Sequence, residues 1–314
     1  MPSVEEFLAE DDRRRSAAMV ELPVLRLRAH GRLTPSGDDG ELTRVSIGPD
    51  GEAIALWRGP VPAITVQSGS GTETVRISSN PPAYAAAQPL PGGRFLVVAG
   101  RCRWRPEGAE RNATVYERDG TVSAEHVFGD GIQHVLTTPA GEAWVGYFDE
   151  GVYGNYGWGS AGTERPIGAP GLIRFGSDGT PAWRFPADQA PPIDDCYALN
   201  VLGESAWACY YSDFPLVRVT GTEMTVWHND VAGGATDLMV DGERAGLVGG
   251  YGDSRSRLAM TLLGDGELHD AGTFRLVLPD GEPLPAEAWT IARGPDLHVF
   301  HALNWYRIAL ADVA

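Results

Sequence analysis

The amino-acid sequence predicts an all-β fold, a single six-bladed β-propeller built from four-stranded antiparallel blades. The main observation is a glycine-led phrase, clearest as Gly141-Glu142-Ala143-Trp144, whose first residue recurs at Gly51, Gly93, Gly141, Gly203, Gly242 and Gly294. Successive copies lie about 40 to 60 residues apart, and repetition at about this period is typical of propellers. The 40 Gly and 23 Pro residues agree, because they suit many short strands joined by turns and would break long helices.

The N-terminal residues 1–20 are expected to form a helix or arm, and residues 21–314 a single propeller domain. Ser3-Val4-Glu5-Glu6 matches a capping box, which predicts a short helix ending near Met19. Beyond it, short apolar runs follow at regular spacing, which is the pattern of β-strands. Blades one and two are predicted to begin with strands at residues 42–47 and 84–89.

The middle of the chain shows four apolar runs in each predicted blade. Blade three has strands at residues 132–138, 142–148, 171–175 and 181–185. Blade four has them at residues 196–201, 205–211, 215–219 and 224–228. Blade five has them at residues 235–240, 244–251, 258–263 and 273–278. Short turns such as Ser177-Asp178-Gly179 separate some of these runs, and Asp-Gly is typical of tight hairpins.

Blade six has three predicted strands, at residues 288–292, 297–303 and 305–310, and lacks a fourth. The apolar run at residues 22–28 is the natural candidate for the missing strand. Closing the ring with strands from both ends of the sequence would remove the exposed edge of an open sheet. We therefore expect an N-terminal strand to close the propeller.

The loops on one face of the predicted disc are much longer than the turns on the other. They include residues 100–112, 149–170 and 186–195, and loops longer than a fold requires usually carry function. The longest begins with residues 149–159, which hold two carboxylates and three aromatic rings among glycines. Such rings can stack on a flat ligand or a sugar, or they can simply cover the end of the barrel.

We predict a ligand-binding site at the mouth of this face, formed by the long loops and the ends of the inner strands. Its residues are Asp149, Glu150, Tyr153, Asn155, Tyr156, Trp158, Tyr197, Tyr211, Asp213, Tyr251, Asn304 and Trp305. The aromatic rings would stack on the ligand, while Asp149, Asp195 and Asp213 would accept its hydrogen bonds. An acidic mouth favours a cationic or hydroxyl-rich ligand.

A catalytic centre in the same funnel is the alternative. His134 or His301 could act as a general base beside Asp195 or Glu287. A lone histidine is more often an ordinary surface or packing residue, and the sequence holds no Gly-x-Ser-x-Gly or His-Glu-x-x-His motif. The enzyme would be a metal-dependent hydrolase, or a metal-free lyase or isomerase with a histidine base.

Charge and cysteine content exclude several classes of partner. The formal net charge of −17 disfavours nucleic acid and anionic membranes. Cys102, Cys196 and Cys209 form no paired motif, so the sequence predicts no disulfide framework. No signal peptide and no membrane span is recognisable, and we expect a cytoplasmic protein.

In its period and turns, the region from about residue 22 to residue 311 resembles the six-bladed propellers of the NHL, YVTN and gluconolactonase-like groups. Gluconolactonase-like enzymes hold a divalent metal in the channel with Glu, Asn and Asp and hydrolyse lactones. The resemblance implies that Glu287, Asn304, Asp195 or Asp237 could hold a divalent cation such as Ca, Mg, Mn or Zn. No motif matches residue by residue, so the metal ligands stay unknown.

Three functions follow from these observations. The first is binding of a small molecule or short peptide in the funnel. The second is an enzyme that uses the same funnel. The third is an interaction scaffold whose loop-rich face holds a protein partner.

Overall fold

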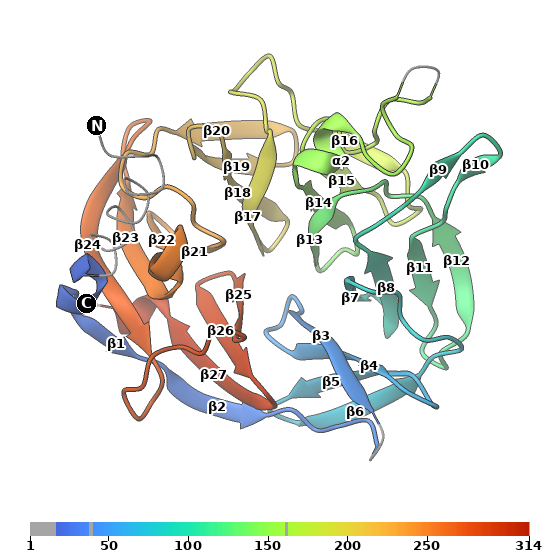
Figure 1. The fold of residues 1–314 in the computed structure, drawn as a ribbon, viewed down its shortest axis with the longest axis horizontal. Helices are drawn as coiled ribbons and strands as arrows, with labels where there is room; N and C mark the ends of the chain where they lie inside the picture. Colours follow the sequence, from blue (N-terminus) through green and yellow to red (C-terminus); the bar gives the residue numbers. More distant parts are fainter. Residues whose placement is uncertain (1–16, 38–39, 161–162, 314) are drawn as a thin grey trace, which may run out of the picture.

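The computed structural model describes residues 17–37, 40–160 and 163–313, and in it six blades surround a central axis (Figure 1). This confirms the predicted six-bladed propeller. Blade one consists of β3 (Glu41–Ile47), β4 (Ala53–Arg58), β5 (Ala63–Ser68) and β6 (Gly71–Arg76). Blade two consists of β7 (Ala85–Leu90), β8 (Arg94–Ala99), β11 (Ala113–Tyr116) and β12 (Val122–His126).

The next two blades repeat the same up-and-down order. Blade three consists of β13 (Ile132–Thr137), β14 (Ala143–Tyr147), β15 (Leu172–Phe175) and β16 (Pro181–Arg184). Blade four consists of β17 (Asp195–Leu202), β18 (Ser205–Tyr211), β19 (Leu216–Thr220) and β20 (Glu223–Trp227). These bounds agree closely with the strands predicted from the apolar runs.

The last two blades include strands from the N-terminal part of the chain. Blade five consists of β21 (Asp237–Asp241), β22 (Arg244–Val248), β23 (Arg257–Leu263) and β24 (Leu268–Val277), with β1 (Val24–Arg26) added at its outer edge. Blade six consists of β25 (Trp289–Arg293), β26 (Asp296–His301), β27 (Asn304–Ala309) and β2 (Arg28–Arg32). The expected closure by an N-terminal strand is therefore confirmed.

The assignment of residues 22–28 to that closing strand is wrong. β1 lies parallel to β24 in blade five, with Val24 opposite Arg275, whereas β2 lies antiparallel to β27 in blade six. Between them, Leu27 is buried in the apolar cluster shared by the two blades, and its N–H donates to Val277 O at 2.9 Å. The apolar run thus serves two blades, because the chain crosses from one to the next at this leucine.

Short irregular elements complete the chain. Of the predicted N-terminal helix, residues 1–16 lie outside the described residues, and residues 17–21 are helical. The insertion in blade two forms the small hairpin β9 (Trp104–Arg105) and β10 (Gly108–Ala109). The helix α2 (Asp149–Tyr153) and the 3-10 turns η1 (Gly252–Ser256) and η2 (Leu310–Asp312) lie in loops. Within the described part of the chain, no helix is long and apolar enough to cross a membrane.

The repeated glycines have a common conformation. All six occupy the left-handed region, with φ of +81° at Gly51, +76° at Gly93, +88° at Gly141, +59° at Gly203, +59° at Gly242 and +53° at Gly294. Each lies in the turn between the first and second strand of its blade. A glycine adopts positive φ without a steric penalty, which explains why the residue recurs there.

Buried polar side chains link neighbouring blades at their inner edges. Asn200 of blade four donates to Leu238 O of blade five and to Gly294 O of blade six, and accepts from Gly294 N at 2.7 Å. Gln88 of blade two makes the corresponding links to Ile47 O and Thr137 N. Apolar clusters fill the space between blades farther out. The inner strands are therefore held in fixed positions around the channel.

Candidate functional site

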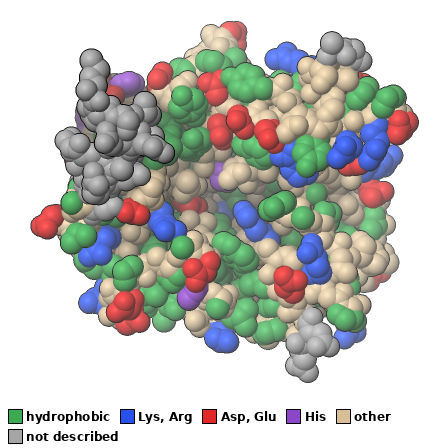
Figure 2. All heavy atoms as spheres, viewed as in Figure 1, with side chains coloured by type: hydrophobic (Ala, Val, Ile, Leu, Met, Phe, Trp, Pro, Cys, Tyr) green, Lys and Arg blue, Asp and Glu red, His purple; other side chains and the backbone are tan. Residues whose placement is uncertain are grey.

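The six innermost strands, β3, β7, β13, β17, β21 and β25, surround the central axis of the propeller (Figure 1). A cavity of about 180 Å³ lies in the channel between these strands and is lined from all six sides. Its polar lining comes from Arg44, Gln133, His134, Asp237 and Thr290. Figure 2 shows the hollow at the centre of the face in view, with basic side chains at its wall and acidic side chains grouped beside it.

A second cavity, of about 370 Å³, lies toward blades one, two and three. Both cavities are lined by Arg44, Ala86, Gln133 and Val135, so they adjoin and form one funnel. The remaining lining of the second cavity is largely aromatic, apolar or basic: Tyr84, Val98, Gly100, Arg101, Ile132, Phe148 and Tyr156. Concave, mostly apolar cavities of this size with a few convergent polar groups are typical of small-molecule sites.

Arg44 stands where the two cavities meet. Its side chain is accessible from the funnel. The surrounding protein desolvates the guanidinium and lowers its pKa, and the nearby Asp237 carboxylate opposes this change. Among the described residues, no side chain or main-chain group forms a hydrogen bond or ion pair with this guanidinium. The funnel therefore contains a cation without a bonded partner.

Two titratable side chains of the channel wall, Asp237 and His134, already form hydrogen bonds within the protein. Asp237 accepts hydrogen bonds from Thr290 Oγ1 at 2.6 Å and from Ala292 N at 3.1 Å, and burial raises the pKa of its carboxyl to about 6. His134 Nε2 lies 3.0 Å from Tyr197 O, and burial lowers the pKa of the imidazole to about 4. At this pKa the ring is neutral near pH 7, and because a carbonyl can only accept, its proton lies on Nε2.

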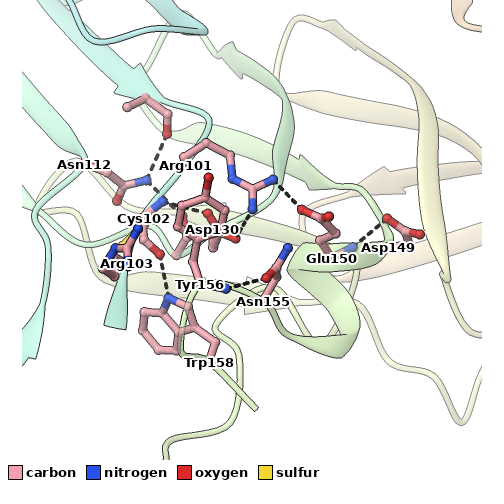
Figure 3. Close-up of polar contacts among 12 residues, drawn as sticks. Arg101, Cys102, Arg103, Asn112, Asp130, Asp149, Glu150, Asn155, Tyr156 and Trp158 are labelled. Carbon is pink, nitrogen blue, oxygen red and sulfur yellow. Dashed lines mark hydrogen bonds and ion pairs between the residues drawn. The ribbon is translucent and has the colours of Figure 1, made fainter. Parts of the chain in front are cut away.

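Arg101, on the wall of the larger cavity, is ion-paired with two carboxylates, although its buried Nε and Nη2 atoms form no hydrogen bond to another described residue. Its guanidinium lies 3.0 Å from Asp130 Oδ2 and also bonds to Glu150, while the Tyr156 ring covers it at 4.2 Å (Figure 3). Asp130 is further bonded by Cys102 N at 2.7 Å. The two carboxylates neutralise the positive charge of Arg101. We therefore interpret Arg101 as a residue that positions the Tyr156 ring.

The aromatic loop of blade three is anchored on the insertion of blade two. Trp158 is buried, and its indole Nε1 donates to Cys102 O at 2.8 Å (Figure 3). Two residues earlier in the loop, Tyr156 O accepts from Trp104 N at 3.0 Å. These bonds place the exposed Tyr156 ring over the larger cavity. The loop expected to cover the mouth is thus a fixed wall of the funnel.

Several of the predicted site residues lie together beside the funnel and line neither cavity. Tyr153 OH donates to Asp194, and Asp149 lies near enough to Asp195 to raise the pKa of its carboxyl further. Burial is the larger cause, and the pKa of Asp195 reaches about 6. Asp149, Asp194 and Asp195 thus form an acidic group on blades three and four, beside the funnel.

A tyrosine cluster adjoins this acidic group. Tyr197 packs edge-on against Phe214 at 5.2 Å and against Tyr251 at 6.4 Å, and stacks on Tyr211 at 6.3 Å. Phe214 was not among the predicted site residues, although it contacts three of them. The exposed Asp213 precedes it in the chain.

The remaining predicted residues lie elsewhere. His301 Nε2 lies 3.1 Å from Glu287 Oε1 on blade six, and this glutamate side chain is 70% exposed. Asn304 accepts from Arg32. Trp305 is buried, with its indole nitrogen bonded to His298 Nδ1 at 3.0 Å, so it offers no face to a ligand. The same holds for the buried Trp158.

Three of the residues that the gluconolactonase resemblance suggested for a cation, Asp237, Glu287 and Asp195, lie in different places. Asp237 is buried in the channel wall, Glu287 pairs with a histidine at the rim, and Asp195 lies beside the funnel. In the residues that the structure describes, no three His, Cys, Asp or Glu side chains are grouped so as to hold a metal ion. Asp195, Asp237 and Glu287 therefore do not form one ligand set for a divalent cation.

Of the residues that line the funnel, the predicted site included His134 and Tyr156 but not Arg44, Gln133, Arg101, Tyr84 or Phe148. Arg44 and Gln133 lie among apolar residues on the innermost strands β3 and β13, and a polar residue in such a strand is a signal for a side chain that points into the channel. Arg101, Tyr84 and Phe148 carry no such signal. They reach the larger cavity because loops of blades two and three fold over it.

Comparison with solved structures finds distant likenesses that extend over most of the chain. A gluconolactonase from Xanthomonas campestris is similar at 12% identity, with a TM-score of 0.48 over 90% of this chain and 98% of that one. A virginiamycin B lyase from Staphylococcus aureus has 10% identity and a TM-score of 0.45, with 88% and 97% covered. A PQQ-bound aldose sugar dehydrogenase from Streptomyces coelicolor has 11% identity and a TM-score of 0.44, with 90% and 97% covered.

These likenesses concern the fold alone. The model of the YxzG family matches residues 185–242, which include blade four. No curated protein matches the chain.

Proposed function

We propose that this protein binds a small organic molecule in the funnel at the centre of its loop-rich face. The observation that carries the proposal is the pair of adjoining cavities, of about 180 and 370 Å³, that share Arg44, Ala86, Gln133 and Val135. Their lining combines apolar and aromatic surface with a few polar groups, as small-molecule sites do.

The lining divides into two functional parts. Phe148 and Tyr156 supply aromatic faces on which a flat part of the ligand packs. Gln133 supplies an amide with both a donor and an acceptor, and the neutral His134 ring adds polar surface without charge. Inter-blade bonds such as those of Asn200 hold the inner strands, so the site is formed before the ligand arrives.

A cavity-filling variant tests this proposal. Ala86 lines both cavities, and Ala86→Trp would occupy the space that the ligand needs. Ala140→Trp adds the same ring at an exposed turn on the opposite face and is the matched control. A library of small organic molecules would be screened by thermal shift, since a ligand that binds the folded state raises its melting temperature.

The proposal predicts that hits stabilise the wild-type protein and Ala140→Trp but not Ala86→Trp. Hits that stabilise all three proteins equally would place binding outside the funnel and overturn the proposal. Circular dichroism of the unliganded variants would verify that Ala86→Trp is folded before the comparison is made.

An enzyme in the same region is the second candidate, favoured by Asp195. This half-buried carboxylate forms no side-chain hydrogen bond to another described residue, and its pKa of about 6 is close to that of a general acid or base. Asp195→Asn would abolish turnover of any substrate found among the hits. Turnover that survives this substitution would exclude Asp195 as the catalytic group.

A further inference from the structure

We propose that the ligand of this funnel carries an anionic group, a carboxylate or a phosphate, that Arg44 binds, next to a flat apolar part that packs on Tyr156 and Phe148. This inference rests on the proposed function, because it assigns a chemical class to the ligand of the same site. Two features of the funnel support it: the Arg44 guanidinium, and the aromatic wall formed by Tyr156 and Phe148.

The first step concerns the charge of Arg44. Its guanidinium lines both cavities and forms no hydrogen bond or ion pair with any other described residue. A guanidinium presents donors in a planar fork that fits the two oxygens of a carboxylate or phosphate. A charged group that is partly removed from water is costly unless it is paired, so an anionic ligand would stabilise the Arg44 guanidinium by pairing with it.

The second step separates Arg44 from the other arginine of the funnel. Arg101 is held by Asp130 and Glu150, and its guanidinium lies under the Tyr156 ring (Figure 3). A ligand anion near it would meet two carboxylates already in place. Arg101 therefore fixes the aromatic wall, and Arg44 is the anchor.

The third step concerns the groups that oppose an anion. The Asp237 carboxylate lies in the channel wall, but both its oxygens already accept bonds from blade six. His134 is bonded to Tyr197 O and is neutral. Asp149 and Asp195 line neither cavity. A ligand anion that approaches Arg44 from the larger cavity therefore avoids the acidic group.

The fourth step concerns the apolar part of the ligand. The larger cavity continues from Arg44 to Tyr84, Phe148 and Tyr156, with Ile132 and Val98 between them. A flat hydrocarbon or heteroaromatic ring attached to the anionic group would extend along this wall. Hydrophobic burial would supply affinity, and Arg44 would supply the discrimination between anionic and neutral ligands.

Three matched probes test the inference on the full chain by isothermal titration calorimetry. They are 2-naphthoate, 2-naphthyl phosphate and the neutral 2-naphthamide, which share one ring system. We expect the wild-type protein to bind one or both anions about tenfold or more tightly than the amide. The stronger of the two anions identifies which of the two groups the site accepts.

Arginine variants connect the preference to one residue. Arg44→Gln should weaken binding of the preferred anion about tenfold and leave the amide within about twofold, whereas Arg44→Lys should recover part of the loss because it keeps the charge. Arg118→Gln, at a 75% exposed side chain on a turn, is the control and should change neither.

The outcomes separate this inference from the proposed function. Ligands that Ala86→Trp excludes, but that bind without regard to charge or to Arg44, would overturn the anionic class and leave funnel binding in place. Absence of any ligand that Ala86→Trp excludes would overturn both. An anion preference that Arg44→Gln leaves unchanged would show that another group is the anchor.

Discussion

The indole nitrogen of Trp158 donates a hydrogen bond to the main-chain carbonyl of Cys102 at 2.8 Å, joining the long loop of blade three to the insertion of blade two. Both partners are buried, so the bond is shielded from water. The joined segments carry Tyr156 and Arg101, which line the larger cavity. The wall of the funnel thus depends on a contact between two loops that are distant in sequence.

Removing this donor should loosen the wall. Trp158→Phe leaves the Cys102 carbonyl without its buried partner, which should lower the free energy of unfolding by about 1–2 kcal/mol. Amide hydrogen exchange should accelerate in residues 149–160. Trp183→Phe, in the outer strand of blade three, is the control and should leave exchange in this loop unchanged. Equal protection in Trp158→Phe and wild type would contradict the proposed anchor.

The link made by Asn200 should be among the strongest single contributions to stability. Asn200→Ala leaves Gly294 N without its buried acceptor and removes one donor each from Leu238 O and from Gly294 O, which still accepts from Val240 N, and we expect a loss of about 2–4 kcal/mol. Asn80→Ala removes one exposed bond, from Gly59 N, and should lose less than about 1 kcal/mol. Urea denaturation of the two variants measures the difference. Similar losses would show that the inter-blade link is not structural.

Two buried histidines should stay neutral well below neutral pH. Burial is the main cause that lowers the pKa of His134 to about 4 and that of His298 to about 3. Their imidazole NMR signals, assigned with His134→Gln and His298→Gln, should therefore not shift between pH 8 and about pH 5. A midpoint near the ordinary value for histidine would mean that the ring is open to solvent.

The Asp195 carboxyl should make stability depend on pH. Its pKa is about 6 in the folded protein, above the ordinary value of 3.8, so the folded state binds this proton more tightly than the unfolded state. The carboxyl therefore favours folding below about pH 4 and disfavours it above about pH 6. Asp195→Asn should gain on the order of 1 kcal/mol at pH 7.5, after allowance for solvent screening, and nothing at pH 4.

Melting curves of wild type and Asp195→Asn at the two pH values measure this effect. Asp265→Asn, at an exposed turn, is the control for a general change in net charge. A gain of equal size at both pH values would show that burial of the charge is not its cause.

The architecture was predictable because its determinants are local. Each repeated glycine, such as Gly141, marks a turn that needs positive φ, and the apolar runs on either side form the paired strands. The exchange of the N-terminal strands was not predictable in this way. Leu25 and Leu27 belong to one apolar run, and only their packing against blades five and six shows where the chain crosses over.

The site was predictable only in outline. The long loop of residues 149–159 does border the funnel, and Tyr156 does face the cavity. Trp158 is buried instead, because its partner Cys102 lies in another blade and no local pattern reveals that contact. Arg44 owes its position to the convergence of six strands, each from a different part of the sequence.

A crystal structure of the protein with its strongest thermal-shift hit tests the central claim most directly. The account predicts electron density for the ligand in the funnel, with its anionic group at Arg44 and its ring on Tyr156. Ligand density among Asp149, Asp195 and Tyr197, or on the opposite face of the disc, would contradict it.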